Sequence, residues 1–121
     1  MIELLDHIQR EKLPTAIITR NSQETAQHIL NKHSLNFDIV ISREDTPPKP
    51  DPTQLNNLVS RFNLDPKQCL YIGDMSFDLD FARNAGVKSG LYVRPNNHSI
   101  KNKADIVISC YDQFLIGQRA L

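Results

Sequence analysis

The chain has 121 residues, a formal net charge of zero at pH 7 and a mean hydropathy of −0.40, which suits one small domain, residues 1–121. The sequence contains no basic stripe with interleaved aromatic residues, and no run approaches the roughly 20 apolar residues that a membrane helix needs. These features argue against binding to nucleic acid or to a membrane. Cys69 and Cys110 lie in apolar strand-like runs, where free thiols pack as small hydrophobes, so we expect a cytoplasmic protein.

The pattern of apolar residues predicts alternating helices and strands. Continuous apolar runs fit strands buried on both faces, whereas apolar side chains three and four residues apart indicate helices with one buried face. The expected elements, in chain order, are helix 2–11, strand 15–19, helix 21–33, strand 37–41, helix 51–62, strand 69–72, helix 77–85, strand 87–93, strand 104–109 and helix 111–121. This alternation predicts the α/β class, as a three-layer Rossmann-like parallel sheet with helices on both faces.

Particular residues are predicted to begin and end these helices. Asn21 is expected to be an N-cap, with Glu24 completing a capping box. Asp51 and Pro52 fit the N-cap and the first-turn proline of the next helix, and Gly86 fits a left-handed helix end. The side chains expected to face the core are Ala26, Ile29 and Leu30, then Leu55, Leu58, Val59 and Phe62, and then Phe77, Phe81, Ala82 and Ala85.

Polar residues are predicted to gather at one edge of the sheet. Right-handed crossovers bring the carboxyl ends of parallel strands to one edge, where open α/β sheets bind ligands. Thr19 ends a strand just before a helix N-terminus that offers N–H groups to an anion, and Lys49 is held in a stiff loop between prolines. Asp74 and Asp78 follow another strand end, where carboxylates suit Mg²⁺. Together these groups indicate a site for phosphate and Mg²⁺.

Each of these residues also has a purely structural interpretation. Thr19 fits as a β-branched residue at a strand end, and Lys49 fits as a solvated lysine in a proline-rich turn. Asp74 and Asp78 fit a charged first helical turn, because a carboxylate there offsets the helix macrodipole. Only the combination of all four residues favours a ligand site.

Three segments carry a family resemblance. Residues 17–21, 49–52 and 73–78 resemble, in order and spacing, motifs two, three and four of the haloacid dehalogenase (HAD) superfamily. Within that superfamily the chain looks closest to the phosphoglycolate-phosphatase-like branch. The resemblance implies a HAD-like core and a Mg²⁺-dependent phosphatase that acts on a small phosphorylated metabolite.

The resemblance also implies a role for each matching residue. Thr19 would hydrogen-bond a phosphate oxygen, and Lys49 would neutralise the phosphoryl group and the nucleophile. Asp74 would ligate Mg²⁺ directly, and Asp78 would do so directly or through water.

Two residues beside Thr19 are further candidates for substrate binding. Arg20 departs from the small or amide residue that we associate with its position, so it is either a substrate contact or a solvated side chain. Asn21 is able to orient a ligand as well as to cap its helix.

The sequence lacks the residue that starts the family's chemistry. In the family, an Asp in an Asp-x-Asp-x-Thr/Val motif ends the first core strand and forms an aspartyl-phosphate with the substrate. No such motif occurs here, and Asp6 lies within an amphipathic helix rather than after a buried strand. We therefore expect the nucleophile, the first central strand and the cap to be missing, and we expect no turnover from this chain alone.

The missing strand has a structural consequence. In the family's sheet it would lie between the strands that begin at residues 15 and 69, so its absence would expose two unpaired ladder edges. Either the two neighbouring strands close up, or an upstream segment or a second copy of the chain, as a homo-oligomer, fills this slot by β-augmentation. The alternative function is a non-catalytic remnant or interaction module that binds a partner there.

Overall fold

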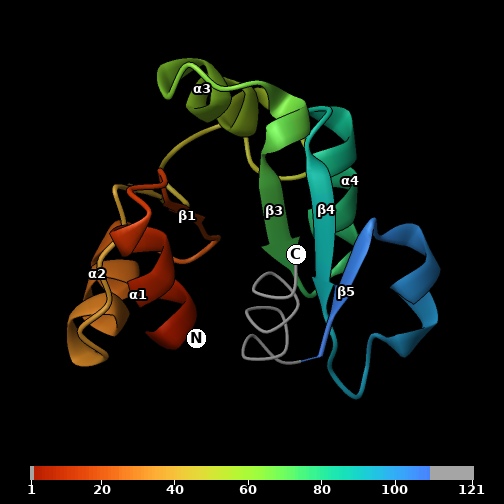
Figure 1. Cartoon of the computed structure of the whole chain (residues 1–121), viewed down its shortest axis with the longest axis horizontal. Coiled ribbons are helices and arrows are strands. Elements are labelled where there is room, and N and C mark those ends of the chain that lie inside the picture. The colour runs from red at the N-terminus through yellow and green to blue at the C-terminus, as the bar shows by residue number, and fades with distance from the viewer. Residues whose placement is uncertain (1, 110–121) are drawn as a thin grey trace. The chain divides into compact units, whose positions relative to one another are not determined.

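The computed structural model describes residues 2–109, which form an α/β structure with parallel strands (Figure 1). Its elements are α1 (Ile2–Arg10), β1 (Ala16–Ile18), α2 (Gln23–Lys32), β2 (Ile39–Ile41), α3 (Thr53–Arg61), the 3₁₀ helix η1 (Pro66–Gln68), β3 (Leu70–Gly73), α4 (Ser76–Asn84), β4 (Lys88–Tyr92), the 3₁₀ helix η2 (His98–Lys103) and β5 (Ile106–Ile108). The predicted α/β class is confirmed, and the helix predicted over 111–121 lies outside the described residues. Within the described part of the chain, no helix is long and apolar enough to cross a membrane.

The strands form two parallel sheets. β1 pairs with β2, with Ala16 opposite Ile39, and a second sheet has the order β3-β4-β5, with Leu70 opposite Lys88. The chain divides after Pro48 into two compact units, which we call unit 1 and unit 2 and describe separately. The single-domain organisation stays a prediction.

Unit 1 contains α1, β1, α2 and β2 around a small apolar core. Its buried apolar side chains, among the described residues, are Leu4, Ala26, Leu30 and Ile41. Ala26 and Leu30 are four residues apart and therefore share one face of α2. The prediction that Ile29 also faces the core is wrong, because Ile29 is 41% exposed. Its position is rotated about 100° from that of Leu30 around the helix, and the buried stripe of α2 does not extend that far.

The start of α2 differs by one residue from the prediction. Ser22 is the N-cap, and its hydroxyl accepts a hydrogen bond from the Thr25 backbone N–H at 3.1 Å. Asn21 instead lies in the preceding turn, where its N–H donates to the Thr19 Oγ1 at 3.1 Å and its carbonyl accepts from the Arg43 N–H at 2.8 Å. These two backbone bonds hold Asn21 outside the helix, so the predicted Asn21 cap is wrong.

Unit 2 has a larger core, in which α4 packs on β3 and β4 (Figure 1). Phe81, Leu79 and Leu91 have the largest fully buried side chains. The predicted core positions of α4 are confirmed at Phe81, Ala82 and Ala85, whereas Phe77 is only half-buried and Leu79 was not predicted. On α3, Leu55, Leu58 and Val59 are buried as predicted, and Phe62 is half-buried.

The ends of two helices in unit 2 follow their local chemistry. α3 begins one residue later than predicted: Pro52 is the N-cap, and the helix starts at Thr53. Asp51 still accepts the expected bond, from the Thr53 N–H at 2.9 Å. Gly86 follows α4 with φ of +72°, which confirms its predicted left-handed conformation.

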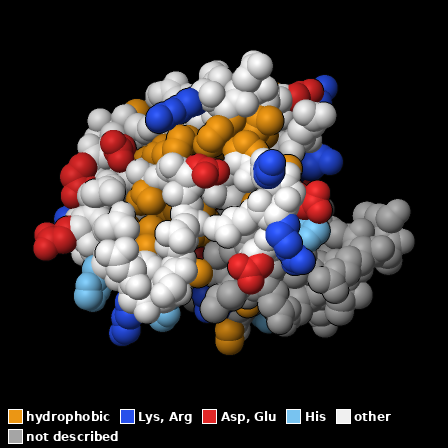
Figure 2. All heavy atoms as spheres, turned by 60° about the vertical axis from the view of Figure 1, so that its left-hand side comes forward, with side chains coloured by type: hydrophobic (Ala, Val, Ile, Leu, Met, Phe, Trp, Pro, Cys, Tyr) orange, Lys and Arg blue, Asp and Glu red, His pale blue; other side chains and the backbone are white. Residues whose placement is uncertain are grey.

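Charged side chains of both signs are interspersed over the face of the molecule that Figure 2 displays. Acidic and basic residues are equal in number, 14 of each, in the whole sequence.

Candidate active site

The turn between β3 and α4 places two carboxylates at the carboxyl end of β3. β3 ends at Gly73, and Asp74 and Met75 connect it to Ser76, the first residue of α4. The Asp78 Oδ2 accepts a hydrogen bond from the Met75 N–H at 3.2 Å, as a capping-box acid does. A Cβ at Gly73 would overlap the Asp78 side chain, so only glycine leaves room for the carboxylate in this position.

Lys49 and Asp78 form a buried ion pair. The Lys49 Nζ lies 2.8 Å from the Asp78 Oδ1, and the two side chains are only 9% and 6% exposed. Nζ also donates to the Tyr71 hydroxyl at 2.9 Å and lies 5.4 Å from the Phe77 ring centroid. The Tyr71 hydroxyl in turn donates to the Asp78 Oδ1 at 3.3 Å. Hydrogen bonds and aromatic rings thus compensate the desolvation of both charges.

Tyr71 is a site residue that the sequence analysis missed. Burial raises its pKa, and the Asp78 carboxylate raises it further, so the phenol stays neutral. Its only signal in the sequence is its place two residues before the glycine that ends β3. There, a large polar side chain in an otherwise apolar strand needs a partner for its hydroxyl.

Asp74 lies closer to solvent and has a different cation as its partner. Its side chain is 42% exposed, and its Oδ2 accepts a hydrogen bond from the Arg94 Nε at 3.1 Å. Its backbone carbonyl accepts a bond from the Asn97 Nδ2 at 2.9 Å. Neither Arg94 nor Asn97 was predicted as a site residue, because no local pattern links a loop after β4 to the end of β3.

The remaining candidates, Thr19, Arg20 and Asn21, lie in unit 1. The Thr19 N–H donates to the Ile41 carbonyl at 2.9 Å, which extends the pairing of β1 with β2 by one bond. Thr19 is half-buried as a residue and its hydroxyl accepts from the Asn21 N–H, whereas Arg20 and Asn21 are exposed. The turn that contains Thr19 is therefore anchored to the end of β2.

Glu44 is a second residue that the sequence analysis missed. Its Oε2 accepts bonds from the Ser42 hydroxyl at 2.8 Å and from the Gln23 N–H, at the start of α2, at 3.0 Å. The bond from Ser42 is the main cause of the lowered pKa of Glu44. The Glu44 carboxylate thereby ties the loop after β2 to the N-terminus of α2.

The carboxylates of unit 2 fit a cation that keeps most of its water. Among residues 2–109 no group of three or more His, Cys, Asp or Glu side chains could hold a metal ion by itself. Mg²⁺, however, is usually bound by one or two carboxylates together with waters and substrate phosphates. Asp74 is exposed enough to bind it directly. Both oxygens of Asp78 already accept bonds, so Asp78 fits better as a ligand through water.

The fold and these strand-end residues define a Rossmann-like α/β protein with acidic and basic side chains at the carboxyl end of β3. The family model described as haloacid dehalogenase-like hydrolase matches residues 1–92, and the chain belongs to this family.

Two curated relatives and one solved structure illustrate the family. The chain is 30% identical to pyrophosphatase PpaX of Bacillus velezensis, over 72% of this chain and 42% of the relative. It is 26% identical to the N-acetylmuramic acid 6-phosphate phosphatase of Pseudomonas aeruginosa, over 88% of this chain and 50% of that protein. Its fold is similar to that of a predicted phosphoglycolate phosphatase from Haemophilus somnus, with a TM-score of 0.83 and 23% identity over 97% of this chain and 55% of the other. The chain thus spans about half the length of the curated relatives it matches.

Proposed function

We propose that this chain forms the phosphate-binding and Mg²⁺-binding part of a HAD-type phosphatase that acts on a small phosphate monoester. The observation that carries this proposal is the buried pair of Lys49, from the loop before α3, with Asp78 in the first turn of α4, four residues after Asp74 at the end of β3. Membership of the family and relatives named as a pyrophosphatase and a phosphatase support a substrate with a phosphoryl group.

Each candidate residue has a separate role in this proposal. Lys49 neutralises the phosphoryl group, and its bonds to Asp78 and Tyr71 hold the ammonium in place before substrate binds. Thr19 donates its hydroxyl to a phosphate oxygen. The exposed residues Arg20 and Asn21 contact the substrate.

Asp74 and Asp78 hold the metal. When bound, Mg²⁺ supplies positive charge that offsets the charge of the phosphoryl oxygens. Asp74 binds it directly from the end of β3. Asp78 would hold it through water while it keeps Lys49 in position.

The proposed chemistry requires a carboxylate nucleophile that forms an aspartyl-phosphate. This sequence contains no Asp-x-Asp-x-Thr/Val motif. We therefore expect no turnover of a generic monoester such as p-nitrophenyl phosphate in the presence of Mg²⁺. If the parent chain turned over the monoester and Asp74→Ala abolished this turnover, the expectation of inactivity would be contradicted. The same result would support the proposed metal site.

The separation of the described strands into two sheets favours a second candidate function. In the described part of the chain β1 pairs only with β2 and β3 pairs only with β4, so β1 and β3 each have a strand neighbour on one side only. A strand edge of this kind binds extended segments by β-augmentation. An upstream segment, a second copy of the chain or another protein would then occupy it. Light scattering that shows a stable monomer at high concentration would count against self-association.

A further inference from the structure

Asn97 joins the ends of two strands in unit 2. Its Nδ2 donates to the Asp74 carbonyl and to the Tyr92 carbonyl, both at 2.9 Å, and its Oδ1 accepts from the Arg94 N–H at 2.8 Å. Both donors of the amide are thus in use, which fixes its orientation. Asn97 is buried, with only 5% of the residue exposed.

This use of Asn97 is unusual for its place in the chain. Asn97 is the N-cap of η2, and an Asn at such a position normally bonds the N–H groups of its own helix. Here the side chain makes no capping bond and reaches the ends of β3 and β4 instead. Its bond to the Asp74 carbonyl holds the backbone from which the Asp74 carboxylate extends.

Arg94 approaches the same carboxylate with a positive charge. Its backbone N–H is held by Asn97, its guanidinium carbon lies 5.4 Å from the Tyr92 ring centroid, and its Nε bonds the Asp74 Oδ2 at 3.1 Å. A divalent cation on this carboxylate would compete with the guanidinium for the same negative charge. The Arg94–Asp74 pair is exposed, 58% and 42% for the two side chains, so it is weak enough to be displaced.

We propose that Asn97 and Arg94 have opposite effects on cation binding by Asp74. Asn97 is a positioning residue that holds the Asp74 carboxylate in place for a metal cation. The Arg94 guanidinium occupies the same carboxylate, and the metal must displace it. This inference rests on the proposed function of Asp74 as a metal ligand.

Titration of the chain with Mn²⁺ tests the inference without any measurement of activity. Mn²⁺ broadens the NMR signals of amides near its site, and here residues 73–78 report binding. We expect Arg94→Gln to tighten Mn²⁺ binding about two- to fivefold, because it removes an exposed ion pair. We expect Asn97→Ala to weaken binding about tenfold or more, because it removes support for a ligand.

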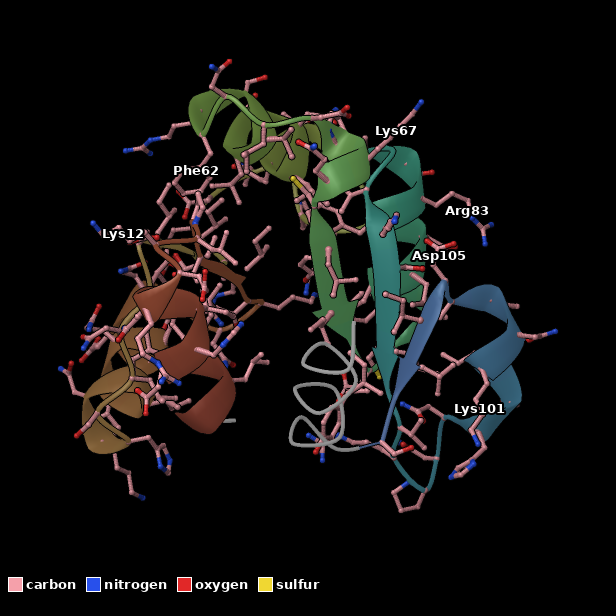
Figure 3. The ribbon with its side chains drawn as sticks, viewed as in Figure 1. Lys12, Phe62, Lys67, Arg83, Lys101 and Asp105 are labelled. Atoms are coloured by element: carbon pink, nitrogen blue, oxygen red, sulfur yellow. The ribbon has the colours of Figure 1, made fainter. Side chains whose placement is uncertain are left out.

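Matched controls separate these effects from general ones. Arg83→Gln removes the same charge from an exposed residue of α4 whose side chain points away from the unit (Figure 3), and Asn96→Ala changes an exposed asparagine next to Asn97. Neither control is expected to change Mn²⁺ affinity beyond a small general effect of charge.

The Mn²⁺ affinities of these variants decide whether the inference holds. Unchanged or weaker binding in Arg94→Gln relative to Arg83→Gln would overturn it, as would Asn97→Ala binding that equals that of Asn96→Ala. If Asn97→Ala does not fold, Arg94→Gln decides alone. If the parent chain binds Mn²⁺ and Asp74→Asn abolishes this binding, the proposed metal site is supported, even where Arg94→Gln does not tighten binding. If the parent shows no broadening at residues 73–78, both the metal site and this inference fail.

Discussion

The buried Lys49–Asp78 pair leads to a quantitative prediction about the stability of unit 2. Replacing Lys49 by Met leaves the Asp78 carboxylate, in a side chain that is 6% exposed, without its cation. Removal of one partner from a buried pair costs about 3–5 kcal/mol. Asp78 keeps its bonds from Tyr71 and Met75, so we expect a loss near the lower end, about 3 kcal/mol.

A double-mutant cycle with Lys49→Met and Asp78→Asn measures the pair itself. Amide hydrogen exchange in β3 and α4 reports the free energy of opening of unit 2, where the pair lies. We expect a coupling energy of about 2 kcal/mol that changes little with salt, because a buried pair is poorly screened. The same cycle at the exposed pair of Arg94 and Asp74 should give at most about 1 kcal/mol, and this coupling should fade at high salt.

The two cycles together test whether the Lys49–Asp78 pair is buried and tightly held. A Lys49–Asp78 coupling below about 0.5 kcal/mol, or one that disappears at high salt, would refute the description of this pair as buried and tightly held. The proposed fixed position of the Lys49 ammonium would then lose its physical basis.

Three further predictions follow from contacts in the two units. Gly73→Ala should destabilise unit 2 by about 1–3 kcal/mol in urea unfolding, because the added Cβ overlaps Asp78, and an unchanged midpoint would contradict that overlap. Burial raises the pKa of Tyr71, so stability should fall as the pH rises above the ordinary tyrosine value of 10.0, and Tyr71→Phe should reduce this fall. The hydrogen bond from Ser42 lowers the pKa of Glu44 in the folded state. The stabilisation from this carboxylate should therefore be present above pH 4.5 and be lost as the pH falls through the lower pKa of the folded state. A Glu44 carboxyl midpoint at or above 4.5 in an NMR titration would contradict this.

Much of the fold was predictable because its signals are local. Short apolar runs predicted all five strands of the described chain, and the periodic apolar residues of α3 and α4 predicted most of their buried faces. The helix starts were less certain, because adjacent residues such as Asn21 and Ser22 are both good caps. Only the backbone bonds from Asn21 to other parts of unit 1 decide between them.

The partners of the candidate site residues were not predictable in the same way. The motifs pointed to Lys49 and Asp78, but these residues are 29 positions apart, and their direct contact depends on the packing of unit 2. Arg94 and Asn97 lie 20 and 23 positions after Asp74. No periodic pattern or short motif connects such positions, so their bonds to Asp74 emerge only when β3 and β4 are paired.

The central claim is that this chain binds phosphate and Mg²⁺ through Lys49 and Asp74. An NMR titration of the chain with inorganic phosphate, with and without Mg²⁺, tests it most directly, with Asp80→Asn on the exposed surface of α4 as the control for Asp74→Asn. We predict Mg²⁺-dependent shifts at Lys49 and residues 73–78 that Asp74→Asn removes and Asp80→Asn preserves. Phosphate binding of equal strength without Mg²⁺ or in Asp74→Asn, or no shift at these residues, would contradict the claim.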